Sequence, residues 1–186
     1  VGVPLGLISG YYGGKVDFGI QRVTDTMLAF SGFLLALALV SVLGVGLKNT
    51  IISVGISMVP IYVRLVRGCT LSVREQTYVE AARAVGTRDR IILLRHILPN
   101  VMAPVTIQTS LGMGTAILFA AGLGFLGLGV QPPTPEWGAM LGSGRAYLFN
   151  SPHVATFPGI AIFLAVLGFN LAGDGLRDVL DPRFRL

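Results

Sequence analysis

The sequence predicts an all-α fold: a polytopic bundle of transmembrane helices with a helix-turn-helix on the cytoplasmic side. Hydrophobic residues make up 53% of the 186 residues, charged residues only 12%, and the mean hydropathy is +0.74, which a water-soluble domain of this length does not tolerate. Long uncharged runs also alternate with short charged segments, as membrane-spanning helices alternate with their loops. Residues 1–186 are therefore assigned to a single transmembrane domain.

Five apolar segments are predicted to lie in the membrane. The first, Val1 to Ser9, is too short to cross ~30 Å of hydrocarbon, so we expect it to be the tail of a span whose beginning is missing. The run from Thr26 to Leu47 carries no charge and is long enough for a complete helix. The next run, Thr50 to Val63, crosses only if Lys48 and Arg64 reach the two interfaces. The predicted spans are 1–9 (partial), 26–47, 49–66, 101–121 and 154–173.

The charges between the spans predict the topology. From Arg64 to Arg95 there are seven arginines against three acidic residues, a net charge of 7 − 3 = +4. The positive-inside rule therefore places the loop 68–99 in the cytoplasm, and the basic C-terminus on the same side. Basic residues that cluster between apolar runs indicate cytoplasmic loops, so nucleic-acid binding is excluded.

Three further segments are predicted to be turns or loops. Residues 10–17 are interpreted as an inside turn in which Tyr11 and Tyr12 lie at the membrane interface. Residues 44–49 are expected to make a tight outside turn. Residues 131–138, rich in proline, are expected to form an extended outside loop.

The largest cytoplasmic loop is predicted to hold two short helices joined at a glycine. Ser72 stands three residues before Glu75, the spacing of a capping box that opens a helix. Gly86 is placed to end that helix in the left-handed conformation. Thr87 is expected to cap the second helix, with Asp89 in its first turn, and Pro99 to close the segment at the edge of the next apolar run.

The first of these helices carries a narrow face of small residues. Tyr78, Ala81, Ala82 and Val85 follow the i, i+3, i+4, i+7 spacing of one face. Alanines let another protein backbone approach closely, whereas a face meant for an ordinary core would more usually carry Leu or Ile. The alternative interpretation is an amphipathic helix-turn-helix that lies on the membrane surface.

Motifs for catalysis, cofactors or metals are not found in the sequence. Residues 122–127 match the G-x-G-x-x-G fingerprint by letters, but they follow a predicted membrane helix, so we interpret them as glycine packing at a helix end. No G-x-x-x-x-G-K-[ST] motif occurs, so any ATP must be bound by another chain. The single Cys69 and the two histidines, His96 and His153, form no metal or nucleophile pattern. The sequence predicts a chain that is not an enzyme and needs no cofactor.

The stretch Glu80-Ala81-Ala82-Arg83-Ala84-Val85-Gly86, with His96-Ile97-Leu98-Pro99 ten residues beyond, resembles the cytoplasmic EAA loop of the membrane subunits of bacterial ABC importers. In that family the loop is the coupling helix that docks on the ATPase, and an isoleucine usually stands where this sequence has His96. The resemblance implies an ATPase-coupling interface formed by Glu80, Ala81, Ala82, Val85, Gly86 and Thr87.

Further segments are similar to the second permease subunit of dipeptide, oligopeptide and nickel importers. They are 10–17, 125–138 and 173–183, which with the EAA loop extend the resemblance over nearly the whole chain. The resemblance implies a type I ABC importer permease in a bacterial or archaeal inner membrane. The implied partners are a sister permease, two cytoplasmic ATP-binding subunits and an extracytoplasmic solute-binding protein. Family members usually have six spans, so the first is expected to be absent here, and the substrate stays open among peptides, nickel and glutathione-like solutes.

Two other classes of membrane protein compete with this interpretation. A secondary transporter or channel would carry ionisable or unwound polar positions within its spans, and these spans are almost free of them. A structural membrane subunit would fit the composition equally well. It gives no reason, however, for a helix-glycine-helix with an alanine face in the largest cytoplasmic loop.

Overall fold

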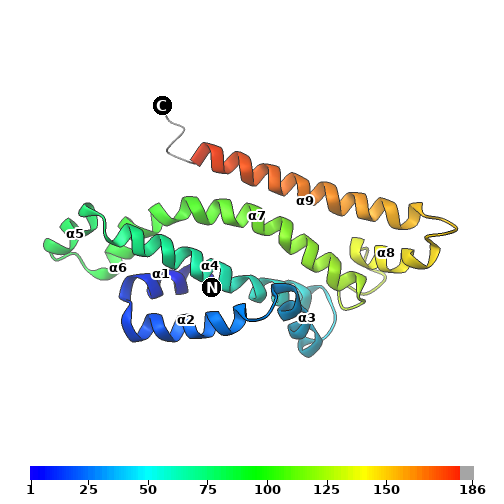
Figure 1. Cartoon of the computed structure of the whole chain (residues 1–186), viewed down its shortest axis with the longest axis horizontal. Coiled ribbons are helices and arrows are strands. Elements are labelled where there is room, and N and C mark those ends of the chain that lie inside the picture. The colour runs from blue at the N-terminus through cyan, green and yellow to red at the C-terminus, as the bar shows by residue number, and fades with distance from the viewer. Residues whose placement is uncertain (181–186) are drawn as a thin grey trace. The chain divides into compact units, whose positions relative to one another are not determined.

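The computed structural model describes residues 1–180, and every regular element in this range is helical. The chain divides into two compact units, whose helices are labelled in Figure 1. Of the described residues, unit 1 comprises Val1–Ala29, Val59–Gln108 and Leu176–Leu180, and unit 2 comprises Phe30–Met58 and Thr109–Gly175. The last six residues, 181–186, which carry part of the predicted basic C-terminus, lie outside the described range.

Unit 1 is built on two helices joined at a single glycine. Gly13, with φ +65°, separates α1 (Gly2–Tyr12) from α2 (Gly14–Leu28), and the two helices lie side by side (Figure 1). The predicted turn over 10–17 is therefore much shorter, because helix continues on both sides of Gly13. The other elements of the unit are the second half of α4 (Leu47–Arg74), α5 (Thr77–Ala84), α6 (Asp89–Ile91), the π-helical turn η1 (Ile92–Ile97) and the start of α7 (Leu98–Phe125).

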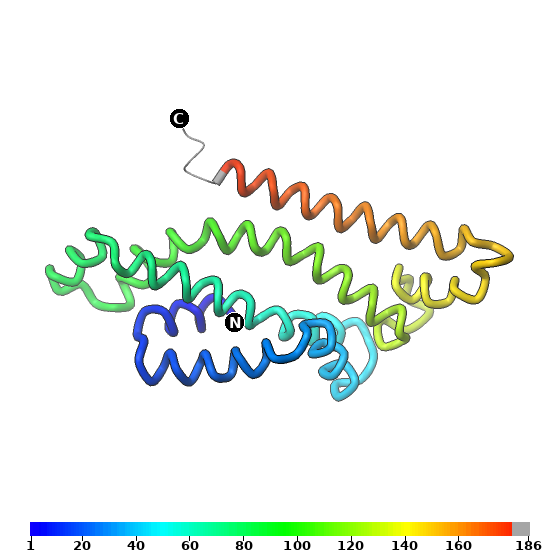
Figure 2. Tube along the Cα trace, viewed as in Figure 1, coloured from blue at the N-terminus to red at the C-terminus, as the bar shows by residue number. Residues whose placement is uncertain are grey.

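Unit 2 has a smaller core, and its helices α7 and α8 (Trp137–Gly144) are in direct backbone contact. Its elements are α3 (Gly32–Leu43), the first half of α4, the rest of α7, α8, the 3-10 turn η2 (Arg145–Tyr147) and most of α9 (His153–Leu180). Buried Ala36, Val40, Val54 and Leu123 form the core. After α7 the chain turns back into α8 (Figure 2). A Cβ on Gly138 of α8 would overlap the Ala121 carbonyl of α7, so only glycine allows this approach.

Within residues 1–180, three helical segments are long and apolar enough to cross a membrane: Leu47–Arg74, Asp89–Phe125 and His153–Val179. The number rises to four if the interrupted pair α2 and α3 is counted as one span. The helices that contain the predicted spans 49–66, 101–121 and 154–173 are all longer than those spans. Which side of the membrane each loop occupies remains a prediction.

The apolar run 26–47 is not one continuous helix. Helix α2 ends at Leu28 and α3 begins at Gly32. Ser31 has an extended ψ of 136° and serves as the N-cap of α3. Serine and glycine are weak helix formers, and Gly32 lies so close to the Phe119 ring that a Cβ there would be 3.2 Å from it. The absence of charge over 26–47 predicted one continuous helix, but Ser31 and Gly32 interrupt it.

The predicted capping box at Ser72 and Glu75 is wrong. Ser72 lies inside α4, which continues to Arg74 without a break at Pro60. The helix persists because Val66 and Thr70 pack directly on the glycines of α1, and such tertiary packing outweighs a local capping signal.

Pro99 does not close the second helix of the loop. The chain is helical from Asp89 to Phe125, and Pro99 lies in the first turn of α7. The π-helical turn η1 immediately precedes α7. The N–H of Leu98 donates to the carbonyl of Leu93, five residues earlier. We attribute the π turn to the proline, which has no N–H to donate to the residue four positions earlier.

The outside loop predicted at 131–138 is shorter than expected, because α8 begins at Trp137. The Glu136 carboxylate accepts hydrogen bonds from the backbone N–H groups of Gly138 and Ala139, at 2.8 and 2.6 Å. Glutamate is not among the usual N-cap residues, so no local pattern predicted this helix.

Candidate coupling interface

The end of α5 has the geometry that the sequence predicted. Gly86 has φ +78° and follows the last helical residue by two positions. Its N–H donates to the carbonyl of Arg83 at 2.9 Å, and the N–H of Thr87 donates to the carbonyl of Ala82 at 3.1 Å. These two bonds form a Schellman motif, which satisfies the last carbonyls of the helix. Glycine is required because a Cβ strains the backbone at this φ.

The start of α5 is defined by the backbone. Gln76 is the N-cap, with φ −78° and ψ 142°, and its side chain makes no capping hydrogen bond. The N–H groups of Val79 and Glu80 donate to its carbonyl at 2.9 and 3.2 Å. Glu80 lies in the first turn, where a carboxylate interacts favourably with the helix dipole.

The two faces of α5 differ in burial. Val79 is fully buried and Ala82 is 9% exposed, and both belong to the core of unit 1. Glu80 and Ala81 are exposed on the other side, and Val85 is 80% exposed. The predicted face therefore needs one correction. Ala82 packs against the chain's own core, so its side chain is not open to a partner.

The second short helix starts one residue later than predicted. Its N-cap is Arg88, without a side-chain capping bond, so the prediction that Thr87 caps this helix is wrong. Thr87 is half-buried and contributes its N–H to the Schellman motif instead. Asp89 occupies the first turn.

Tyr11 connects α1 to this segment, a role that the sequence did not reveal. We expected an interfacial tyrosine, yet Tyr11 is buried, while Tyr12 is 52% exposed. The Tyr11 hydroxyl donates to Oδ1 of Asp89 at 2.6 Å, and the Arg83 guanidinium lies over its ring, 5.2 Å from the centroid. Burial and the bond to Asp89 raise the pKa of Tyr11, and Arg83 acts in the opposite direction.

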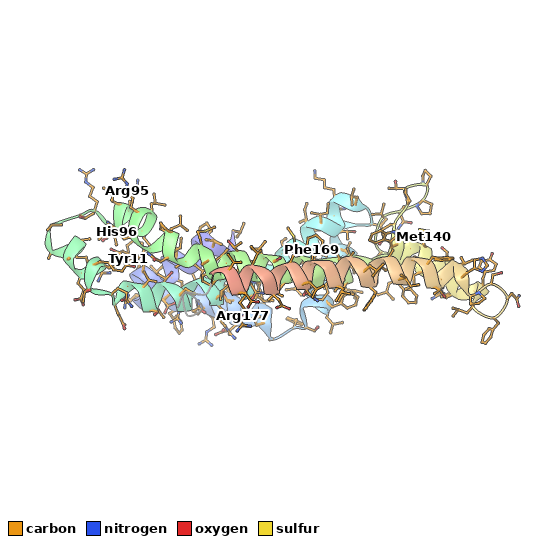
Figure 3. All side chains as sticks on the ribbon, turned by 90° about the horizontal axis from the view of Figure 1, so that it is seen from above. Tyr11, Arg95, His96, Met140, Phe169 and Arg177 are labelled. Atoms are coloured by element: carbon orange, nitrogen blue, oxygen red, sulfur yellow. The ribbon has the colours of Figure 1, made fainter. Side chains whose placement is uncertain are left out.

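His96 and Tyr78 form a second contact in this region. Their ring centroids are 6.4 Å apart, and Asn100 donates to the Tyr78 hydroxyl at 3.1 Å and to the His96 carbonyl at 2.7 Å. Figure 3 labels Tyr11, Arg95 and His96 at the end of unit 1 that carries α5 and α6. The side chain that departs from the EAA pattern thus packs within the segment and holds α5 next to η1.

Together these contacts fix a short helix by its inner face and leave its outer face open. The outer face has low relief, with a small alanine between a carboxylate and a valine. Small residues on such a surface allow the backbone of another protein to approach closely.

The comparisons with known proteins agree on one kind of protein. Residues 2–186 match the family described as binding-protein-dependent transport system inner membrane component. The dipeptide transport system permease protein DppC of Alkalihalophilus pseudofirmus is 52% identical over 184 residues, which are 99% of this chain and 60% of that protein. The glutathione transport system permease proteins GsiD of Escherichia coli and Pectobacterium atrosepticum are 54% and 50% identical over 185 residues, all of this chain and 61% and 62% of those proteins. The chain thus spans about three fifths of the length of these relatives.

Proposed function

We propose that this chain, which belongs to the family of binding-protein-dependent transport system inner membrane components, is a permease subunit of an ATP-driven importer. It forms half of a translocation pathway, and a separate chain hydrolyses the ATP. It lies in a bacterial or archaeal inner membrane, with α5 and the C-terminus in the cytoplasm. The net charge of +4 between Arg64 and Arg95 supports this orientation.

The partners of the subunit follow from this role. A sister permease forms the other half of the pathway, two ATP-binding subunits dock in the cytoplasm, and an extracytoplasmic protein delivers the solute. The family description supports the last of these partners, because it refers to transport that depends on a binding protein.

The substrate is a small peptide. The names of the relatives support this class, since they are permeases for dipeptides and for glutathione, which is itself a tripeptide. Identities of 50–54% do not separate these two substrates.

The outer face of α5 is the surface that docks on the ATPase. The observation that carries this proposal is the contrast between its faces, with Val79 buried in unit 1 and Val85 80% exposed. Gly86 ends the helix, so the docking surface is short and has a fixed length. Movement of the ATPase on binding ATP then displaces α5 and shifts the permease between inward and outward access, as in domain rotations driven by ligands.

Gly86→Val tests this role directly. A β-branched residue at φ +78° costs on the order of 1–3 kcal/mol, and α5 relieves this strain by losing its C-terminal turn. We expect the full-length subunit, expressed with its partners, to insert normally but to retain much less ATPase per permease on purification and to lose uptake.

The matched control is Gly127→Val. Gly127 has the same φ of +78°, also has no atom within 4 Å of the position that a Cβ would take, and ends α7 with the same pair of hydrogen bonds in unit 2. It should keep wild-type ATPase retention. Equal retention in Gly86→Val and wild type, or equal losses in the two variants, would show that α5 is not the docking element.

A further inference from the structure

Helices α1 and α4 pack backbone to backbone along a stripe of glycines. Gly2, Gly6 and Gly10 recur every four residues on one face of α1. A Cβ on Gly6 or Gly10 would lie 2.7 Å from the Cβ of a residue on α4, and one on Gly2 would lie 2.6 Å away. The facing residues on α4 are also spaced by four: Tyr62, Val66 and Thr70. Contacts this close leave no room for the helices to slide past each other without separating.

Polar contacts fix the same pair of helices at the end near α5. Arg74, the last residue of α4, donates to the carbonyls of Gly10 and Tyr11 at 3.3 and 3.0 Å. Arg67 of α4 makes a bidentate ion pair with Asp17 of α2, with both N···O distances at 2.6 Å. This pair is less than one third exposed at either side chain. Helices α1, α2 and the second half of α4 are therefore held together as one block.

The segment from α5 to α6 (77–91) packs on this block through Val79 and Ala82, and among the described residues its side-chain hydrogen bond to the block comes from Tyr11. The Tyr11 hydroxyl reaches Asp89 beyond the glycine turn, and its ring lies under Arg83 of α5. Tyr11 thus contacts Arg83 on one side of the Gly86 turn and Asp89 on the other. The chain itself connects α4 to α5 only through Glu75 and Gln76.

We infer that Tyr11 is a positioning residue that transmits the movement of α5 to the block of α1, α2 and α4. This inference rests on the proposed docking of the ATPase on α5. The hydroxyl to carboxylate bond and the ring under Arg83 make α5, α6 and α1 move together when the ATPase moves. Without the hydroxyl, α5 remains docked through its outer face, but part of its displacement is lost in the two-residue connection to α4.

The predicted consequence is uncoupling. Tyr11→Phe keeps the buried ring and removes only the hydroxyl, so the subunit should still fold and bind the ATPase. Coupling free energies between sites correspond to factors of about 5–150. We therefore expect uptake per ATP hydrolysed to fall at least about fivefold, while ATPase retention and the rate of hydrolysis stay within about twofold of wild type.

The experiment uses the full-length subunit with its sister permease, both ATPase subunits and the binding protein, reconstituted in liposomes. Uptake of radiolabelled glutathione or a radiolabelled dipeptide, whichever the wild-type complex transports, is measured together with phosphate release. A purely structural loss lowers uptake and hydrolysis in proportion, because both scale with the amount of intact complex. The ratio of uptake to phosphate release therefore reports how well the movement of α5 is transmitted, independently of the amount of intact complex.

Four further variants sharpen the result. Tyr12→Phe removes the same hydroxyl from the exposed neighbouring ring and should leave the ratio unchanged. Asp89→Asn keeps an acceptor for the Tyr11 hydroxyl and should retain most of the coupling. Asp89→Ala should behave like Tyr11→Phe, and the double variant of Tyr11→Phe and Asp89→Ala should be no worse than either alone, because both remove one interaction.

The outcomes separate this inference from the proposed function. If Gly86→Val loses the ATPase but Tyr11→Phe keeps the wild-type ratio, α5 is the docking element and Tyr11 transmits nothing. If Tyr11→Phe itself loses ATPase retention, its role is to shape the docking surface, and the inference is also overturned. The inference is supported if Tyr11→Phe retains the ATPase but lowers the uptake per ATP hydrolysed, while Asp89→Asn keeps this ratio near the wild-type value.

Discussion

Helices α5 and α7 end in the same Schellman motif but in opposite surroundings. Gly86 and Gly127 share φ +78° and the same two hydrogen bonds, and neither has an atom near the position of a Cβ. Around Gly127, however, the chain is packed on itself, with α8 touching the backbone of α7 through Gly138 and Gly142. Beside Gly86, by contrast, the side chain of Val85 is 80% exposed.

The difference shows how one local motif serves two purposes. At the end of α7 the glycine turn lets the chain fold back and bury backbone against backbone, which makes a rigid corner. At the end of α5 the same turn limits the length of a helix whose outer face covers nothing in unit 1. The glycine fixes the direction of the chain in both cases, and the difference lies in the packing beside the turn: α8 contacts the backbone of α7, whereas the outer face of α5 is exposed.

The largest expected difference between the two regions is the side of the membrane on which they lie. In a Cys69→Ser background, Val85→Cys should react with a membrane-impermeant maleimide only after the cells are permeabilised. Phe149→Cys, between α8 and α9, should react in intact cells. Both side chains are highly exposed, 80% and 101%, so access to the thiol does not limit the reaction.

Cys69 is a poorer probe of this topology. It is half-buried and packs against the core of unit 1, so it can escape labelling on either side of the membrane. Labelling of Val85→Cys from outside would overturn the orientation and the cytoplasmic placement of α5.

The next difference concerns stability. Gly138→Ala puts a methyl group into the carbonyl of Ala121, and because the obstacle is backbone, we expect a loss of about 3 kcal/mol or more. Gly86→Ala meets no atom and carries only the strain of its positive φ, about 1–2 kcal/mol. Size-exclusion chromatography after heating in detergent measures the fraction of monodisperse protein. A Gly138→Ala variant as heat-resistant as Gly86→Ala would contradict the rigid corner at α7.

The positive φ at Gly86 was predictable because a glycine after an alanine-rich helix is a strong local signal. The burial of Ala82 was not, because the sequence spacing groups it with Ala81 and cannot say which side of a short helix meets its own core. The bond between Tyr11 and Asp89 joins residues 78 positions apart, and no local pattern specifies it.

The apolar runs predicted where helices exist but not where they stop. Ser31 and Gly32 interrupt the run 26–47, and α4 passes through Pro60 and Ser72 because its far half packs on the glycines of α1. These boundaries depend on tertiary contacts, which composition and periodicity do not contain. The overall class, an all-helical chain with several apolar segments, depends only on hydrophobicity and was predicted.

The docking of an ATPase on the outer face of α5 is tested most directly by cross-linking. In the Cys69→Ser background, a photoactivatable maleimide on Ala81→Cys should join the subunit to the ATPase on illumination of the assembled transporter. The same probe on Met140→Cys, exposed on α8, should not. An adduct between subunit and ATPase from Ala81→Cys alone is the predicted result. An ATPase adduct from Met140→Cys, with none from Ala81→Cys, would contradict the account.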